Sequence, residues 1–492
     1  MQKVECADAQ YRVEEIRLGP RDTVIKFPAF SNDGCHLAYA TRRDGNWVVV
    51  VDGAEGPEYD GIWKESIVFS PDGERVAYVA YKKGTWWMVW AAEGRTKSLV
   101  VVDGVPGPEY DGIEEGTPVF SPDGKRVAYV AKKGRKWLVV VDGVPGPEYD
   151  RIGEGTLLFS PDSQRVAYGA KKGGKELVVV DGVPGPEYDG GAALVFSPDG
   201  QRVAYGVRQG AKWMVIVDGV AGPEYDGIGA LVFSPDGQRV AYVAKKGGKA
   251  VVVVDGVAGP EYDGIGEGTP VFSPGGQRVA YVADKDGNWL VVVDGVAGPE
   301  CDDIMEGRPV FSPDGTRVAY AAKKGTKWLV LVDGLAGADY DGIMEGTPVF
   351  SPDGQQVAYA AKKGEKMLVV VDAVAGPEYD GIMEGTPVFS PDGKRVAYAA
   401  QKGPKWLVVV DGVPGPEYDG IGASSPVFSA DGKRVAYSAE KGPKTIVVVD
   451  GVPGPEYDGM IPNGPTFHKD GVLEYLAGRD EALYRVKHHP IQ

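Results

Sequence analysis

The sequence is poor in the residues that build the most familiar catalytic and metal sites. Among 492 residues there are three cysteines, Cys6, Cys35 and Cys301, and four histidines. Cysteines that are so few and so scattered do not form a disulfide framework or a zinc cluster. The chain also has no G-x-S-x-G pattern, the turn that carries the nucleophile of α/β-hydrolases. These absences predict a protein that is not an enzyme.

Long apolar runs are missing as well. Runs such as Val251–Val254 have the length of a strand, whereas a membrane helix needs about 20 apolar residues. The first 22 residues hold no apolar stretch of the kind found in a signal peptide. The net charge of −17 argues against a nucleic-acid backbone as the main partner. We therefore expect a cytoplasmic protein that binds neither membrane nor nucleic acid.

One phrase, by contrast, recurs twelve times. Its core reads FSPDG followed by RVAY, and many of the 72 glycines return at fixed places within it. The copies begin at Phe30, Phe69, Phe120, Phe159, Phe196, Phe233, Phe272, Phe311, Phe350, Phe389, Phe428 and Phe467. Eight of the intervals are 39 residues, one is 51 and two are 37. A period near 40 residues predicts a repeat architecture, in which each unit buries its apolar surface against its neighbours.

The copy that begins at Thr117 shows what one unit should form. Short stretches rich in β-branched and aromatic residues predict four strands, over residues 117–121, 126–131, 136–141 and 148–152. Turn residues separate these stretches, as in Pro122-Asp123-Gly124, where proline fixes φ and glycine accepts a positive φ. Each copy is therefore predicted to be a four-stranded antiparallel meander.

The predicted strands are apolar on both faces, so each sheet should be covered on both sides. Four-stranded sheets packed face to face around an axis form a β-propeller. A β-solenoid is the alternative, but its repeats are shorter and its strands are parallel. We therefore expect an all-β fold, a β-propeller of twelve four-stranded antiparallel blades.

The motif also resembles a known family. FSPDG followed by RVAY, as at Phe120–Gly124 and Arg126–Tyr129, resembles the WD-like blades of TolB and of prolyl-oligopeptidase propellers, over about residues 25–487. The Asp-box of sialidase propellers is a poorer match, because Asp and Gly are adjacent here. The resemblance implies a propeller blade and little about activity. Prolyl-oligopeptidase relatives add an α/β-hydrolase domain, for which we expect no room in this chain.

The last copy lacks a fourth strand, and the N-terminal segment could supply it. Strands are predicted there over residues 465–468, 472–477 and 482–487, with no fourth strand after them. Tyr11–Leu18 precedes the first copy at the place where a fourth strand belongs. We predict that residues 1–29 provide a closing strand, which pairs with the last strand of the chain and completes the last blade.

The twelve copies could form one ring or two. Rings of about four to eight blades are usual, which favours two tandem six-bladed propellers with a seam near residues 256–261. The tetrapeptide DGNW occurs at residues 44–47 and again, six copies later, at residues 286–289, which favours two rings of six blades. The loop at the seam, however, is the same DGVAGPE that joins two strands of one blade elsewhere, and no linker interrupts it. We favour a single ring, formed by one continuous array over residues 1–492.

The turns predict two differently charged faces. PDG turns and DGVPGPE loops should lie on one face and make it acidic. KKG turns, such as the one at Lys132 and Lys133, should place a circle of lysines on the other. Such a circle could steer an acidic partner. Lysines also protect sheet edges from association, and we prefer this second interpretation.

Functional information should lie where copies depart from the consensus. The second copy carries an insertion of about a dozen residues, whose candidate partner-binding residues are Trp86, Trp87, Met88 and Trp90. An exposed aromatic patch of this kind marks a partner or ligand site. The alternative is that the insertion folds over its own blade and buries its tryptophans.

Three successive copies carry methionine where the others have glycine or glutamate. Met305, Met344 and Met383 should lie near one mouth of the channel, and methionine surfaces adapt to partners. They are therefore further candidates for partner binding, and the alternative is that they fill gaps between blades. Cys301 replaces a recurrent tyrosine and should be a single buried thiol.

These observations predict a non-catalytic scaffold that mediates protein–protein interactions through the propeller faces and the Trp-rich insertion. We expect a monomer with an unidentified protein partner. The alternative function is a small-molecule or glycan-binding, lectin-like propeller with one site repeated in each blade. His36 and His468 could approach each other as a metal pair, but they lack a third ligand nearby. We predict no catalytic residue, no cofactor and no metal site.

Overall fold

The computed structural model describes residues 2–4, 11–20, 26–32, 36–82, 96–305, 309–346, 348–460, 464–468, 470–480 and 482–490. Every regular element in these ranges is a β-strand. None of the described residues belongs to a helix that could cross a membrane. The prediction of an all-β chain is confirmed. The chain divides into two compact units, one of residues 1–22, 248–252 and 259–492 and one of residues 23–247 and 253–258.

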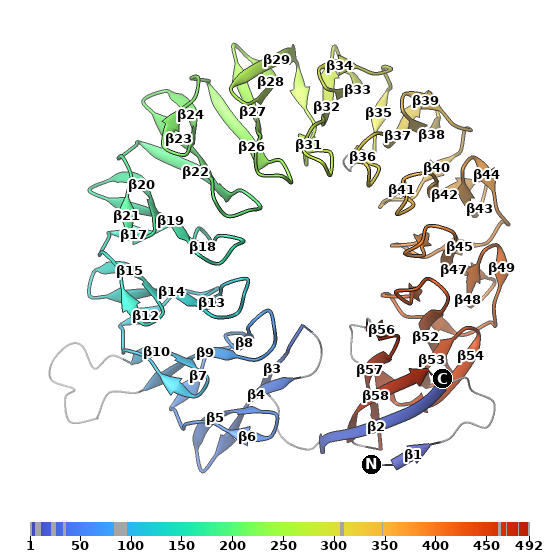
Figure 1. Ribbon diagram of the computed structural model, residues 1–492, viewed down its shortest axis with the longest axis horizontal. Coiled ribbons are helices and arrows are strands. Elements are labelled where there is room, and N and C mark those ends of the chain that lie inside the picture. The colour runs from blue at the N-terminus through green and yellow to red at the C-terminus, as the bar shows by residue number, and fades with distance from the viewer. Residues whose placement is uncertain are drawn as a thin grey trace. The chain divides into compact units, whose positions relative to one another are not determined.

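The described strands form twelve sheets of four to six strands (Figure 1). In one of them β12 (Gly112–Ile113), β14 (Val127–Lys133), β15 (Lys136–Val141) and β16 (Val144–Pro145) lie side by side in this order, and β13 (Val119–Phe120) also pairs with β14. All of these pairings are antiparallel. The predicted four-stranded antiparallel unit is thus present.

Two long strands form the centre of each sheet. The first has seven residues: β4 (Leu37–Arg43), β9 (Val76–Lys82), β14, β19 (Val166–Lys172), β23 (Val203–Gln209), β27 (Val240–Lys246), β32 (Val279–Lys285), β37 (Val318–Lys324), β42 (Val357–Lys363), β47 (Val396–Lys402), β52 (Val435–Lys441) and β57 (Leu473–Arg479). The second follows it: β5 (Asn46–Val51), β10 (Lys97–Val102), β15, β20 (Lys175–Val180), β24 (Lys212–Val217), β28 (Lys249–Val254), β33 (Asn288–Val293), β38 (Lys327–Val332), β43 (Lys366–Val371), β48 (Lys405–Val410), β53 (Lys444–Val449) and β58 (Ala482–Pro490).

The strand predicted over residues 148–152 is divided between two sheets, so that prediction was wrong. Tyr149 forms a bridge with Trp137 of its own sheet. β17 (Arg151–Ile152) instead pairs with β19 in the next sheet. Asp150 explains the crossing, because its carboxylate accepts hydrogen bonds from Lys136 Nζ (2.6 Å) on one sheet and from the backbone N–H of Gly173 (2.7 Å) on the next.

The first strand of most copies is shorter than predicted. β13 has only two residues, because the loop before it separates it from β12. In the two 37-residue copies this loop is missing, and β22 (Gly190–Phe196) and β26 (Gly227–Phe233) run without interruption, each with one shift in register. The GEGT segment is therefore an insertion within a single strand.

Neighbouring sheets of one unit are joined by a repeated arginine contact. Arg126 Nε donates to Asp142 Oδ2 (2.9 Å), and its Nη1 donates to the carbonyl of Gln164 in the next sheet (2.8 Å). Its guanidinium lies 5.4 Å from the ring centroid of Phe159. The same cation–π contact recurs at Arg75–Phe120, Arg165–Phe196, Arg202–Phe233, Arg278–Phe311, Arg317–Phe350, Arg395–Phe428 and Arg434–Phe467. Arginine thus links one copy to the next.

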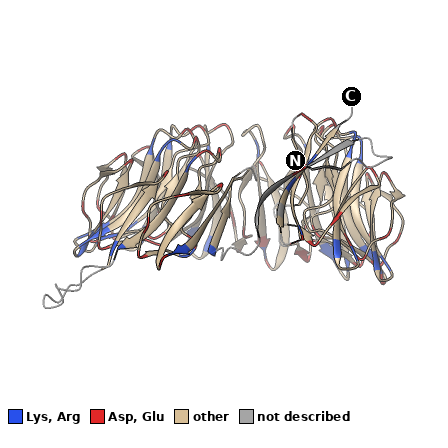
Figure 2. Ribbon diagram, turned by 90° about the horizontal axis from the view of Figure 1, so that it is seen from below, with Lys and Arg blue, Asp and Glu red and all other residues tan. Residues whose placement is uncertain are grey.

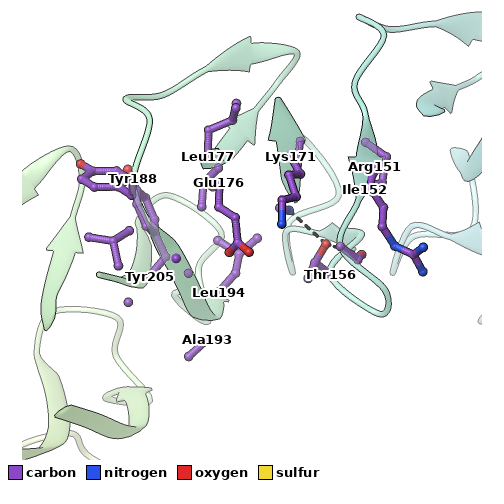
Figure 3. Close-up of a pocket in the computed structure, with 18 residues that line it drawn as sticks. Arg151, Ile152, Thr156, Lys171, Glu176, Leu177, Tyr188, Ala193, Leu194 and Tyr205 are labelled. Carbon is purple, nitrogen blue, oxygen red and sulfur yellow. Dashed lines mark hydrogen bonds between the residues drawn. The ribbon is translucent and has the colours of Figure 1, made fainter. Parts of the chain in front are cut away.

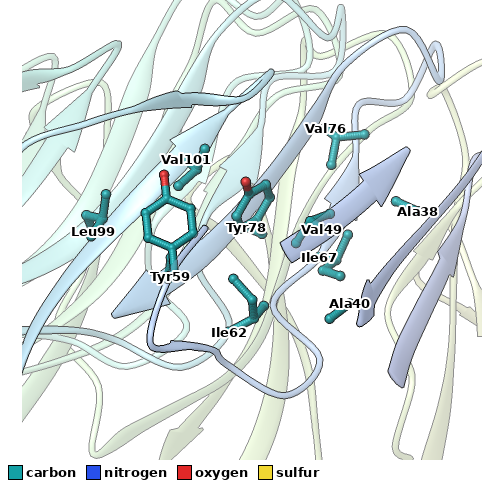
Figure 4. Close-up of a cluster of buried hydrophobic side chains, with 11 residues drawn as sticks. Ala38, Ala40, Val49, Tyr59, Ile62, Ile67, Val76, Tyr78, Leu99 and Val101 are labelled. Atoms are coloured by element: carbon teal, nitrogen blue, oxygen red, sulfur yellow. The ribbon is translucent and has the colours of Figure 1, made fainter. Parts of the chain in front are cut away.

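The apolar core lies between the sheets. Figure 4 shows one such cluster, in which Val49 and Tyr59 from one sheet pack against Ile67, Tyr78 and Leu99 from the next. The rings of Tyr59 and Tyr78 meet edge to face, with centroids 6.3 Å apart. Because both faces of an inner sheet are covered in this way, strands such as β14 are buried at five consecutive positions.

The predicted pairing of the N-terminal segment with the end of the chain is present. β2 (Tyr11–Pro20) pairs antiparallel with β58 across its whole length. Glu15 of β2 is 4% exposed. Its carboxylate accepts two hydrogen bonds from Arg479, one of them at 3.0 Å, and one from the Tyr457 hydroxyl (2.7 Å). A buried ion pair therefore fixes this strand to the last sheet.

The predicted separation of charge between two faces was wrong. At one end of a sheet Arg126 pairs with Asp142, and at the other end Lys133 pairs with Glu148 (3.0 Å). Figure 2 accordingly shows basic and acidic residues at both ends of the sheets. The cause is the divided strand described above, which carries Glu148 and its equivalents back to the lysine turns. These pairs are largely exposed, and each contributes about 1 kcal/mol or less.

One turn has alanine where the other copies have glycine, and this substitution gives a prediction for the stability of the chain. Asp–Gly turns such as Asp411-Gly412 have positive φ at both residues, but in one copy the second residue is Ala373, with φ of 63°. An L-residue in this region costs about 1–2 kcal/mol. We expect Ala373→Gly to stabilise the chain by about 1 kcal/mol in chemical denaturation. Gly412→Ala is the matched control, since a Cβ there meets nothing within 4 Å. It should destabilise by a similar amount, and equal stability of both variants and the parent would contradict the argument.

Candidate binding surface

A groove recurs between neighbouring sheets at the end that carries the PDG turns. Three of these grooves have volumes of about 430, 310 and 630 Å³. In the first, Val105 and Pro106 of β11 (Val105–Pro106) form one wall, and Val127 and Tyr129 of the next sheet form the other. Corresponding residues line the other two grooves, which contain Val374 and Val413. The site is thus a product of the repeat itself.

A row of exposed apolar side chains follows these grooves. It consists of Val105, Val144, Val183, Val220, Val257, Val296, Leu335, Val374, Val413 and Val452, which are 41% (Val452) to 77% (Leu335) exposed. Single exposed apolar residues are ordinary on a protein surface. A residue of the same kind at the same place in ten successive sheets, beside a groove, is a regular surface pattern.

Each groove also holds a polar group. Tyr398 lines one groove, and its hydroxyl is buried without a hydrogen-bond partner among the described residues. Burial raises the pKa of Tyr398, so the hydroxyl stays protonated and can donate. Tyr129 and Tyr437 lie at the corresponding places in the other two grooves. Each groove thus combines apolar side chains and a tyrosine with charged residues, such as Lys394 and Asp411.

The arginines at the grooves belong to the framework. Arg75 lines one groove, but its Nε donates to Asp103 (2.8 Å) and its guanidinium lies over Phe120. An arginine that is held by a carboxylate and a ring is not available to bind a free anion. Gly107, which lines the same groove, is also part of the framework. A side chain there would be crowded, because a Cβ on Gly107 would lie 3.0 Å from the carbonyl oxygen of Val100.

The candidates from the Trp-rich insertion, Trp86, Trp87, Met88 and Trp90, lie outside the described residues. The three candidate methionines are described, and all are half-buried. Met305, Met344 and Met383 each pack against the apolar cluster between two sheets. Their side chains therefore fill space between sheets, and part of each remains accessible.

The remaining candidates stand apart from the grooves. Cys301 is 5% exposed, and burial raises the pKa of its thiol, which agrees with the single buried thiol predicted. His36 Nδ1 lies 2.6 Å from Asp52 Oδ2, and His468 Nε2 lies 3.5 Å from Glu474 Oε2. The described residues contain no group of three or more His, Cys, Asp or Glu side chains placed to hold a metal.

The groove residues were not singled out from the sequence. Val105 and Pro106 belong to the DGVPGPE segment, which had been interpreted as a loop. A signal was present, since an apolar residue follows Asp–Gly in nearly every copy although turns usually carry polar residues.

Solved structures of other propeller proteins are similar to this chain at low identity. TolB from Acinetobacter baumannii is 17% identical, with 51% of this chain and 75% of that chain covered and a TM-score of 0.24. The β-propeller domain of the Trilobed protease from Pyrococcus furiosus is 17% identical, with 56% and 96% covered and a TM-score of 0.25. A eukaryotic initiation factor is 14% identical, with 65% and 89% covered and a TM-score of 0.34.

A comparison with curated proteins found no match. A family model described as the TolB beta propeller domain matches residues 228–411. This stretch extends from β26 to the end of β48 and contains the FSPDG and RVAY segments on which the resemblance was based. Residues 228–411 therefore match the family that the sequence resembles.

Proposed function

We propose that this chain is a non-catalytic binding platform for a protein partner, and that the partner lies along the row of exposed valines. The recurrence of one groove with one exposed apolar residue beside it carries the proposal. An extended peptide can place apolar side chains in successive grooves. Avidity over several weak sites then gives affinity that no single groove provides.

A second function has an observation in its favour. The three grooves are equivalent, so each could bind one small molecule or glycan in the manner of a lectin. Their volumes of about 310 to 630 Å³ fall within the range of small-molecule sites. The two functions differ in stoichiometry, because a peptide spans several grooves whereas separate small ligands occupy one each.

Selection from a random dodecapeptide library against the intact chain tests the proposal. We expect binders rich in apolar residues, with far fewer peptides bound per chain than there are grooves, as measured by calorimetry. Replacing Val144 and Val183 together by lysine should weaken binding at least tenfold, because a buried charge opposes apolar contact. Both side chains are exposed, so the denaturation midpoint should not change.

Thr326→Lys is the matched control for the added charge. Thr326 is exposed in a turn between β37 and β38, at the end of the sheet away from the grooves, and Arg135 is its counterpart in another copy. Peptide affinity that survives lysine at Val144 and Val183 would overturn the proposal, and so would a selection that yields no binder. One small sugar or peptide per groove would favour the second function.

We also propose that the twelve sheets form one closed ring and that the pairing of β2 with β58 is its closure. The uninterrupted DGVAGPE segment near residues 256–261 supports one ring, since it forms the same turn there as elsewhere. Blades counted in electron-microscope projections test this: twelve around one axis is the expected result, and two rings of six would overturn it. A monomer in the cytoplasm fits a binding platform and is proposed with it.

A further inference from the structure

One gap between sheets differs from all the repeated grooves. It lies between the sheet of β17, β19 and β20 and the sheet of β22, β23 and β24, and it contains a cavity of about 350 Å³ (Figure 3). Both sheets belong to the same compact unit. The cavity lies at the point where the 39-residue spacing of the copies changes to 37.

The cavity exists because three side chains that fill the preceding gap are missing from this one. In the preceding gap Val130, Trp137 and Ile152 pack together in one apolar cluster. The residues at these three repeat positions here are Gly169, Glu176 and Gly191. All three line the cavity. Glycine at the first of these positions recurs in the next copy as Gly206, but this gap alone combines it with Glu176 and Gly191.

Glu176 takes the place of apolar side chains. It stands at the start of β20 where six other copies have tryptophan, and it is half-buried. A Cβ on Gly191 would lie 3.3 Å from Glu176 Oε2, so the carboxylate occupies the space that an isoleucine fills elsewhere. Figure 3 shows this carboxylate within the cavity, beside Leu194. No described residue forms an ion pair with it within 4.0 Å.

The rest of the cavity is apolar inside and cationic at its rim. Its inner wall consists of apolar groups, which include Val178, Leu194 and the ring of Tyr205. Tyr188 is half-buried at the cavity, whereas its counterpart Tyr149 is 3% exposed. Two cations, Lys171 and Arg151, are exposed at the rim. Lys171 lies across from Glu176 in the register of β19 and β20.

We propose that this cavity binds a small molecule with an apolar, ring-sized body and a cationic amine. The body packs against Val178, Leu194 and Tyr205, and the ammonium binds the carboxylate of Glu176. A cavity of about 150 Å³ holds one benzene ring, so about 350 Å³ holds a fused pair of rings with a short side chain. Glu176 is the one acidic residue among the residues that line the cavity. The site is distinct from the repeated grooves, because the combination of Gly169, Glu176 and Gly191 occurs in one copy and its neighbour only.

Tryptamine and indole-3-acetate, which share a ring and differ in charge, are the probes. Calorimetry on the full chain should show one tryptamine bound per chain and at least tenfold weaker binding of indole-3-acetate. Glu176→Gln keeps the shape of the side chain and removes its charge, so it should abolish the preference for the amine. Glu224→Gln, which removes an exposed carboxylate from the next copy, should leave both affinities unchanged.

Gly169→Val and Gly191→Ile restore the residues that pack in the preceding gap, so the chain should still fold. Each should fill the cavity and reduce tryptamine affinity at least tenfold; a Cβ on Gly169 makes only ordinary contacts, the nearest at 3.5 Å. Three results would overturn the proposal: no tryptamine binding at millimolar concentration, equal or tighter binding of indole-3-acetate, or unchanged affinity after the cavity is filled. None of them bears on peptide binding at the exposed valines.

Discussion

Replacing Glu15 by alanine should destabilise the last sheet by about 3 kcal/mol. The substitution leaves the guanidinium of Arg479 and the hydroxyl of Tyr457 without the carboxylate that binds both. Breaking a buried ion pair costs about 3–5 kcal/mol. We expect the low end of that range, because the Arg479 side chain is 24% exposed and water can replace part of the contact.

Hydrogen exchange measures this effect where it occurs. A loss of about 3 kcal/mol corresponds to roughly 100-fold faster exchange of the amides that pair β2 with β58. Glu148→Ala is the matched control, since it breaks a pair whose side chains are 67% (Lys133) and 45% (Glu148) exposed. It should cost no more than about 1 kcal/mol. Equal effects of the two substitutions would show that burial of Glu15 contributes nothing.

The sheet unit could be predicted from the sequence because its turns are local. The Asp–Gly pair before Val144 and the Pro-Asp-Gly turn before Arg126 fix a hairpin within a few residues. The crossing at Asp150 could not be predicted in the same way. Its carboxylate binds groups on two different copies, Lys136 and Gly173, and a pattern read within one copy contains no information on that contact.

The two candidate sites could not be predicted from the sequence, for two different reasons. The exposed valines stand at a position that is apolar in every copy that has it, so they are not among the departures from the repeat. The cavity at Glu176 depends on Gly169 and Glu176 of one sheet and on Gly191 of the next, which meet only when the two sheets pack. Gly169 and Gly191 are 22 positions apart and lie on different sheets. Each glycine is unremarkable alone, and their combination becomes visible only in the folded chain.

The stability of the chain should fall by about 3 kcal/mol as the pH is lowered from about 6.5 to 4. His488 on β58 is 1% exposed, and burial, followed by the nearby Arg434, lowers its pKa from 6.5 to about 4. Between these two values the unfolded chain binds a proton that the folded chain does not, so stability declines as the pH falls. A shift of this size corresponds to about 3 kcal/mol.

The pH window separates this histidine from the carboxylates. Asp123, whose pKa is lowered to about 2 mainly by hydrogen bonds from Ser121 and from the Lys125 N–H, loses its contribution only below about pH 4. Denaturation at a series of pH values should therefore show two steps. His488→Gln should remove the step between pH 6.5 and 4 and leave the lower one. Tyr475→Phe removes the hydrogen bond to His488 Nε2 (3.0 Å) but not the burial, so it should leave the upper step in place. If His488→Gln leaves the upper step unchanged, the cause lies elsewhere in the chain.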